Sequence, residues 1–192
     1  MNLKELTWEN HKRAERKGFA KILLSGDISP ELYYRYLTNQ YYNYVILEDA
    51  LKIQGLPIYL HGVFRAKHIL NDMQELEQLH GFVYEPYITT PSNAQYVDHI
   101  YNLEKNGQYE KLLAHMYVRH FGDMYGGAII QKRVPGSGTM YDFDNKEELK
   151  QQLRELLTDD MAEEANICFE FAIRLFEELE QYVTDMGQPD KS

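Results

Sequence analysis

Cysteine, long apolar runs and an excess of positive charge are all scarce or missing in this 192-residue sequence. The single cysteine, Cys168, excludes an internal disulfide framework and fits a reducing compartment. No apolar run approaches the ~20 residues of a membrane-spanning helix, and no charged-then-apolar leader opens the chain. A formal net charge of −10 argues against general nucleic-acid binding, which needs a basic surface. We therefore expect a soluble, cytoplasmic protein with no membrane anchor and no nucleic-acid partner.

Amphipathic runs separated by short breakers make up the rest of the chain, with no convincing strand pair, repeat or linker. The pairs Ser29-Pro30 and Thr90-Pro91 are typical of a helix cap followed by a first turn. Helices are expected over residues 3–17, 30–53, 59–72, 73–80, 90–105, 108–133, 145–157 and 159–183. The pattern predicts a single all-α domain.

The most informative segment is the expected helix over residues 108–133, which holds Gly122, Gly126 and Gly127 near its middle. Each interior glycine costs about 1 kcal/mol relative to alanine, yet apolar and basic residues at helical spacing resume directly afterwards. Two structures would compensate this cost. A neighbouring helix could cross closely over small residues, or a flat cofactor could lie against bare backbone at which the helix bends. Spacing alone leaves both open.

His11 is the next candidate, because a neutral imidazole is a suitable axial ligand for haem iron. It follows Lys4 by seven residues on the first expected helix, so the two side chains share a face. A cation two turns away could then meet a haem propionate. Taken alone, a helical histidine is more often a surface or hydrogen-bonded residue than a ligand.

Four stretches of the chain together resemble the haem oxygenase family. The first helix of that family carries a Thr-x-x-x-His-x-x-Ala-Glu pattern, and a Tyr-x-x-Leu-Glu motif follows it. The distal helix carries Tyr-x-Arg-x-x-Gly-Asp-x-x-Gly-Gly, and a Phe and a Leu-Phe-Glu-Glu-Leu run mark the last core helix. In this chain the matching residues are Thr7, His11, Ala14 and Glu15; Tyr44–Glu48; Tyr117, Arg119, Gly122, Asp123, Gly126 and Gly127; and Phe169 with Leu175–Leu179. The resemblance covers nearly the whole chain in one order.

The resemblance implies an all-α fold in which haem lies between a proximal N-terminal helix and a kinked, glycine-rich distal helix. His11 would be the iron ligand, and Gly122 and Gly126 would lie over the opposite haem face. Asp123 would hold ordered water for the oxygen chemistry. With Arg119, these distal residues form the expected catalytic group.

Anchors for the haem propionates are implied at Lys4, Lys150 and Arg154. Tyr117 would hold a propionate or the distal water chain, and Phe169 completes the expected haem-binding residues. Lysine and arginine would act as charge partners for carboxylates, arginine with bidentate geometry. The alternative for Lys150 and Arg154 is ordinary solvated helix charge.

The activity that the resemblance implies is oxidative cleavage of haem at a meso carbon, the alpha position, to biliverdin, Fe²⁺ and carbon monoxide. Haem would be both substrate and prosthetic group, and O₂ and electrons would be supplied. The expected electron donor is a ferredoxin or a flavoprotein reductase. A cluster of cations beside His11 could dock it, although it could equally be a solvated helix face. This cluster consists of Lys12, Arg13, Arg16 and Lys17.

Two departures from the family pattern affect the distal side. Met124-Tyr125 stands where the family often has Leu-Ser, so a hydroxyl and extra bulk are expected near the pocket. Ala172 stands where mammalian relatives carry asparagine. The expected domain covers residues 1–183, and 184–192 is expected as a short polar tail. Because no hydrophobic tail follows, a soluble bacterial, algal or viral type is favoured.

Two other functions remain as alternatives. One is a haem carrier or sensor that ligates haem through His11 without chemistry, and Asp123 beside the glycines favours the enzyme over it. The other is a di-iron carboxylate oxygenase, which needs a Glu-x-x-His pair on each of two helices. Only Glu77 and His80 show that spacing, so the di-iron interpretation is weaker.

Overall fold

The long helices begin where the sequence supplies a side-chain cap. In the computed structural model, which describes residues 2–85 and 88–186, Asn2 forms a reciprocal capping box with Glu5 at the first helix. Ser29 accepts a hydrogen bond from the Leu32 N–H, and Thr90 accepts one from the Asn93 N–H. Each of these two caps is followed by proline at the first helical position, as the sequence predicted.

The described residues form α-helices joined by short turns, and no strand occurs among them. The α-helices are α1 (Leu3–Glu15), α2 (Gly18–Ser25), α3 (Pro30–Ile53), α4 (Ala66–His80), α5 (Pro91–Lys105), α6 (Tyr109–Met116), α7 (Gly122–Gln131), α8 (Lys146–Arg154) and α9 (Ala162–Met186). Short 3₁₀ turns cover Ile58–Val63, Thr139–Tyr141 and Asp159–Met161, and a π-helical turn covers Tyr117–Phe121. The all-α fold class is therefore confirmed.

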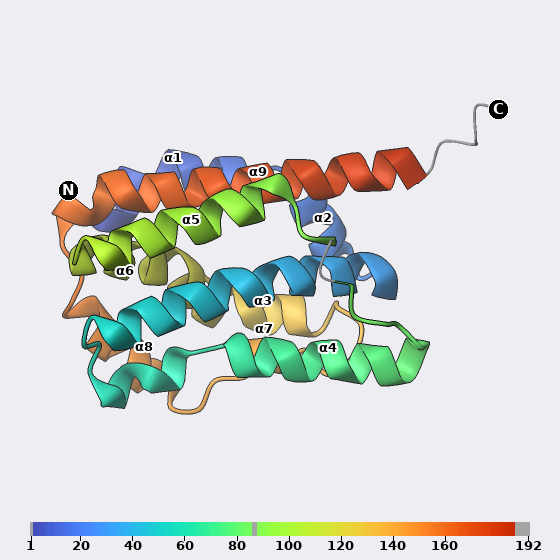
Figure 1. Ribbon diagram of the computed structural model, residues 1–192, viewed down its shortest axis with the longest axis horizontal. Helices are drawn as coiled ribbons and strands as arrows, with labels where there is room; N and C mark the ends of the chain where they lie inside the picture. The colour runs from blue at the N-terminus through green and yellow to red at the C-terminus, as the bar shows by residue number, and fades with distance from the viewer. Residues whose placement is uncertain (1, 86–87, 187–192) are drawn as a thin grey trace.

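The long helices set the frame of the molecule (Figure 1). Helix α3 lies between α4 and α5, and α9 runs alongside both α1 and α5. Buried apolar side chains fill the space on each side of α3: Leu47 and Leu51 pack towards α5 and α6, while Tyr33 and Leu37 pack towards α4. A smaller cluster of Ala14, Phe169 and Ile173 joins α1 to α9. This last contact fixes α1, and with it His11, relative to the core.

Several helix boundaries predicted from the sequence were wrong, and the expected helix over residues 59–72 is in fact a 3₁₀ turn at Ile58–Val63 followed by the start of α4 at Ala66. The first expected helix ends at Glu15, and a separate helix, α2, begins at Gly18, where the Phe19 N–H donates to Glu180 of α9 at 2.8 Å. The expected break at residues 72 and 73 does not exist, because α4 is continuous from Ala66 to His80. Asp72 is buried inside that helix and accepts hydrogen bonds from Thr139 and Met140. At both places the backbone or side chain has a hydrogen-bond partner distant in sequence.

The last helix is longer than expected. Helix α9 runs to Met186, three residues beyond the boundary predicted at residue 183. The remainder of the expected polar tail, 187–192, lies outside the described residues. Among the helices that the structure describes, none combines the length and the apolar character needed to cross a bilayer.

The glycine-rich helix is one continuous run of α6, the π-turn and α7. Its irregular hydrogen bonding lies at Tyr117–Phe121, ahead of the Gly126-Gly127 pair where a bend was expected. The three glycines serve different purposes. A methyl group built on Gly122 or Gly126 would meet nothing within 4 Å, whereas one on Gly127 would lie 2.6 Å from Cδ1 of Tyr141. Close packing thus explains Gly127, and open space faces the other two.

These glycines give a stability prediction. Gly127→Ala should lower the free energy of unfolding by about 1–2 kcal/mol, because the new methyl group overpacks against the buried ring of Tyr141. The matched control, Gly126→Ala, should raise it by about 0.5–1 kcal/mol through helix propensity. Urea unfolding followed by circular dichroism measures both. Equal stability of the two variants would contradict the packing assigned to Gly127.

Candidate functional site

A cavity of about 890 Å³ lies between α1 and the glycine-rich helix. Its volume is near the upper end for small-molecule sites, so it suits a large ligand. Side chains from both ends of the sequence meet there. Its lining consists of Asn2, Leu3, Lys4, Thr7, Trp8, His11, Glu15, Tyr117, Val118, Phe121, Gly122, Tyr125, Gly126, Arg154, Leu157, Asp159 and Phe169.

His11 forms part of the α1 wall and is held between two aromatic rings. Trp8 stacks on the imidazole with ring centroids 5.4 Å apart, and Phe169 of α9 meets it edge-on at 5.8 Å. The Nε2 atom lies 3.7 Å from Oε1 of Glu15, one turn further along α1. The Nδ1 atom is buried and has no hydrogen-bond partner among the described residues. His11 thus lines the cavity with neither ring nitrogen in a hydrogen bond among the described residues, and such an imidazole can serve as a metal ligand.

The opposite wall is bare backbone. Val118, Gly122 and Gly126 recur at four-residue spacing, so they line one face of the same helical run. The space beside both glycines is open, as the 4 Å clearance of their missing Cβ atoms shows. Phe121 and Tyr125 flank this strip, with ring centroids 5.0 Å apart. An imidazole on one wall and main chain on the other fit a flat ligand that carries a metal ion.

Asp123 lies on the helix behind this strip and is not among the residues that line the cavity. The Tyr44 hydroxyl of α3 donates a hydrogen bond to its carboxylate. Burial raises the pKa of Asp123 to about 6, and the hydrogen bond from Tyr44 only partly offsets that rise. A carboxyl group with this pKa exchanges its proton close to neutral pH, which suits a proton-handling role.

Arg119, the other predicted catalytic side chain, is also buried outside the cavity lining. Its Nε donates to the Tyr96 hydroxyl at 2.9 Å and its Nη1 to Oε1 of Gln40 at 3.1 Å. These partners come from α5 and α3. Arg119 therefore holds this helix against the core, and it does not itself line the cavity.

The predicted carboxylate anchors divide into two groups. Lys4, Tyr117 and Arg154 line the cavity, and Arg154 donates a hydrogen bond to the hydroxyl of Tyr125. The Nζ of Lys150 instead lies 2.8 Å from Glu147 and 4.2 Å from the centroid of the Tyr125 ring. Lys150 is absent from the lining, because its side chain is turned to a carboxylate on its own helix.

Sequence reasoning missed several residues that shape the cavity. Trp8 stacks on His11, Val118 extends the glycine strip by one turn, and Phe121 covers its edge. Helical spacing from His11 and Gly122 could have identified the first two. Tyr125 does lie in the lining, as its substitution for serine suggested.

Glu48, the end of the Tyr44–Glu48 motif, is a buried acceptor under the distal helix. His120 lies 3.0 Å from its Oε1, and the backbone N–H groups of Arg65 and Ala66 donate to the same carboxylate at 2.5 and 3.2 Å. The carboxylate therefore caps α4 and ties that helix to the π-turn.

The cations beside His11 are largely engaged. Lys12 pairs with Glu9 at 2.6 Å, Arg13 with Glu170, and Lys17 with Glu177. The cluster is thus a mixed surface of both charges. Glu77 and His80 do not converge either: Glu77 accepts a hydrogen bond from Tyr34 at 2.5 Å, and His80 stacks on Phe82. The arrangement gives no support to a di-iron site there.

Comparisons with known proteins agree with this geometry. A family model described as heme oxygenase matches residues 1–178. The chain is 31% identical to heme oxygenase 2 of Macaca fascicularis over 93% of its own length, and it spans 64% of that relative's length. It is also 31% identical to heme oxygenase 1 of Synechocystis, covering 93% of this chain and 83% of the relative. The crystal structure of heme oxygenase-1 from Synechocystis in complex with heme superposes with a TM-score of 0.80, at 25% identity, over 96% of this chain and 93% of that one.

Asp123 gives a pH-dependence prediction. Its folded pKa of about 6 lies above the ~3.9 of an unfolded aspartate, so its contribution to stability is full below pH ~4 and is lost as pH rises through 6. Relative to Asp123→Asn, the parent protein should lose about 1–2 kcal/mol of unfolding free energy between pH 4 and 7. This expected loss of unfolding free energy is smaller than the whole pKa difference would give, because the Asp123 side chain is partly exposed and solvent screens its charge.

Urea unfolding of both proteins across that pH range measures the difference. The asparagine of the variant can still accept the hydrogen bond from Tyr44 but cannot lose a proton, so the comparison isolates the titration of Asp123. If the difference in unfolding free energy between parent and Asp123→Asn stays constant with pH, or if the parent gains stability relative to the variant as pH rises, Asp123 does not titrate near pH 6.

Proposed function

Because the chain belongs to the haem oxygenase family, we propose that it binds haem in the cavity between α1 and α7 and cleaves it oxidatively to biliverdin, Fe²⁺ and carbon monoxide. The observation that carries the proposal is the pairing of His11 with the bare backbone of Gly122 and Gly126 across one cavity of about 890 Å³. Haem supplies the iron at which O₂ binds and the macrocycle that is oxidised.

His11 is the proposed iron ligand. Its stacking on Trp8 and its edge contact with Phe169 fix the plane of the imidazole, and Glu15 lies close enough to orient it. The cluster of Ala14, Phe169 and Ile173 holds this part of α1 on α9. Ligation through a rigid helix places the iron at a defined depth in the cavity.

Gly122 and Gly126 leave the other face free for a small gas molecule, since neither supplies a side chain that could ligate the iron. Asp123, positioned by Tyr44, holds water and a proton behind that face. Arg119 anchors the same helix through Tyr96 and Gln40. Because Asp123 does not line the cavity, we expect it to deliver protons to the distal face through ordered water and not by touching the ligand itself.

The haem carboxylates are proposed to lie towards Lys4, Tyr117 and Arg154, three lining residues that carry a positive charge or a hydroxyl group. Their positions set the rotation of the macrocycle in its plane and therefore which meso carbon, the alpha carbon in our proposal, faces the distal side. Tyr125 fixes Arg154 by accepting its hydrogen bond. Lys150 acts on this group indirectly, by packing over the Tyr125 ring.

Electrons are proposed to come from a ferredoxin or a flavoprotein reductase that docks near α1. The mixed charges of Lys12, Arg13 and Lys17 with their carboxylate partners allow a partner to exchange ion pairs there. The free, buried thiol of Cys168 is consistent with a reducing cytoplasm as the place of action.

A turnover experiment tests the function. Purified protein mixed with hemin and a reductant in air should lose the Soret band and form biliverdin. His11→Ala should lose the parent's axial-ligand spectrum, and Asp123→Asn should bind haem while forming less biliverdin. His80→Ala, on an exposed residue at the end of α4, is the matched control and should behave as the parent.

A stable ferrous–oxygen complex in the parent, with no biliverdin, would instead indicate the haem carrier that the sequence left open. An unchanged axial-ligand spectrum in His11→Ala would overturn the assignment of the ligand.

The two predicted anchors on α8 can be separated by haem affinity. Arg154→Ala should weaken haem binding roughly 5–20-fold, because a charged donor leaves the cavity lining. Lys150→Ala should change it less than about threefold, since its ammonium is paired with Glu147 outside the lining. Titration with hemin followed at the Soret band measures both. A larger effect at Lys150 than at Arg154 would reverse the assignment.

A further inference from the structure

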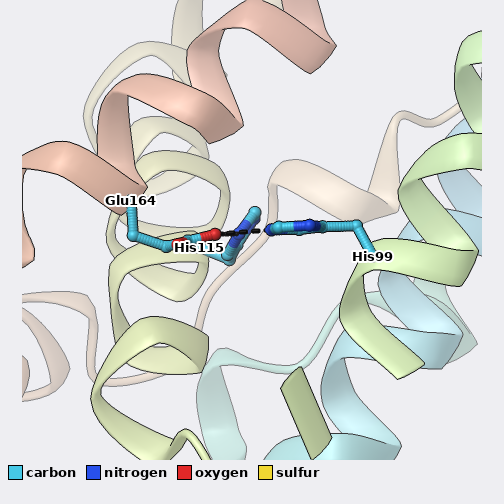
Figure 2. Close-up of side chains that lie close together, drawn as sticks. All are labelled: His99, His115 and Glu164. Carbon is cyan, nitrogen blue, oxygen red and sulfur yellow. Dashed lines mark hydrogen bonds and ion pairs between the residues drawn. The ribbon is translucent and has the colours of Figure 1, made fainter. Parts of the chain in front are cut away.

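Three side chains from different helices converge at a second place in the fold. His99 of α5, His115 of α6 and Glu164 of α9 each present one ligand atom, and these atoms lie within 4.8 Å of one another. The Nε2 atoms of His99 and His115 lie 2.5 and 2.9 Å from the same carboxylate oxygen, Oε1 of Glu164. Figure 2 shows both imidazoles directed at that carboxylate. No other group of this kind occurs among residues 2–85 and 88–186.

This cluster is separate from the haem cavity, because His99, His115 and Glu164 are all absent from its lining. His115 and Glu164 are buried, and the side chain of His99 is 28% exposed. Each is carried by a helix whose position is fixed by core packing, so the three ligand atoms are held together before any ligand binds. What the cluster binds is therefore independent of the function proposed above.

Two imidazole nitrogens and one carboxylate form a set of ligands that prefers some metal ions over others. Neutral imidazole suits Zn²⁺, Fe²⁺, Co²⁺ and Ni²⁺, whereas Mg²⁺ and Ca²⁺ favour sites built from oxygen alone. Three protein ligands also leave coordination positions open to water, as in catalytic rather than structural zinc sites. The chemistry thus selects a divalent transition metal.

Access and charge favour a cation at this place. A cavity of about 130 Å³ adjoins Glu164, and its lining holds four carboxylates, one ammonium group and the apolar side chain of Met161. The carboxylates are Glu110, Asp160, Glu163 and Glu164, and the ammonium group is that of Lys111. An excess of negative charge in a small recess raises the local concentration of cations. The recess also has room for water, which would complete the coordination.

The geometry needs only a small adjustment. Two ligand atoms at ~2.1 Å from one metal lie about 3.0–3.4 Å apart, depending on the coordination angle. The 2.9 Å separation of His115 and Glu164 is close to this, and the partly exposed His99 must withdraw by roughly half an ångström. The Nζ of Lys111 lies 3.6 Å from Oε2 of Glu164. It is a competing cation that a metal ion would have to displace.

We propose that His99, His115 and Glu164 bind one divalent transition-metal ion, with water completing its coordination and Lys111 opposing it. The site couples three helices, so metal binding also ties α5 and α6 to α9. Arg119, which anchors the distal helix, lies one turn after His115 on the same continuous helical run.

The test uses tag-free, haem-free protein titrated with Co²⁺ and with Zn²⁺. Co²⁺ should bind at one equivalent and give ligand-field absorption bands, and Zn²⁺ should displace it. His99→Ala should weaken binding by about tenfold or more, as expected when one of three ligands is lost. The matched control His80→Ala should bind as the parent does. His11→Ala should also bind normally, which separates this site from the haem cavity.

Lys111→Met distinguishes a metal site from a cluster that only holds the helices together, because only a metal site should gain Co²⁺ affinity in this variant. Removing the competing ammonium should tighten Co²⁺ binding by about 3–10-fold. Parent protein that shows no saturable binding, or equal affinity in His99→Ala, would overturn the proposal. Should His99→Ala fail to fold by circular dichroism, unchanged or weaker Co²⁺ affinity in Lys111→Met would overturn it.

Discussion

The structure depends on a helix that keeps one strip of its backbone bare. Val118, Gly122 and Gly126 face a cavity in which no side chain occupies the space beside either glycine. A helix of this composition is weak by itself, because each interior glycine costs about 1 kcal/mol relative to alanine. It persists because the surroundings hold it from behind. Gly127 packs against the buried ring of Tyr141, a contact that requires the missing side chain.

Behind the bare strip, buried and half-buried polar groups fix the helix to the core. Arg119 reaches Tyr96 and Gln40, Asp123 accepts from Tyr44, and His120 pairs with Glu48. A buried charge is stable only when such partners are in place, so these contacts specify one position for the helix. The burial that secures the helix also raises the pKa of Asp123, because it disfavours the charged carboxylate, and the hydrogen bond from Tyr44 offsets only part of that rise.

The α1 wall is organised by apolar contacts instead. His11 lies between the Trp8 and Phe169 rings, above the small cluster of Ala14, Phe169 and Ile173. One wall therefore presents a fixed imidazole and the other an open strip of backbone. The polar side of the glycine-bearing run continues to His115, so the proposed metal site and the distal wall are parts of one helical unit. A flat ligand and a metal ion could each restrain that unit from a different side.

Local sequence determined the helical class, the caps at Ser29 and Thr90, and the motifs that identify the family, because these depend on neighbours a few residues apart. It also placed His11 and the glycines on helices. Only the tertiary structure decided which glycine packs and which lies open, since Tyr141 approaches Gly127 from a distant turn. It likewise brought Arg154 but not Lys150 into the lining, and brought His99 to Glu164 across 65 residues. Such pairings are set by how helices pack, and helical spacing within one segment carries no information about them.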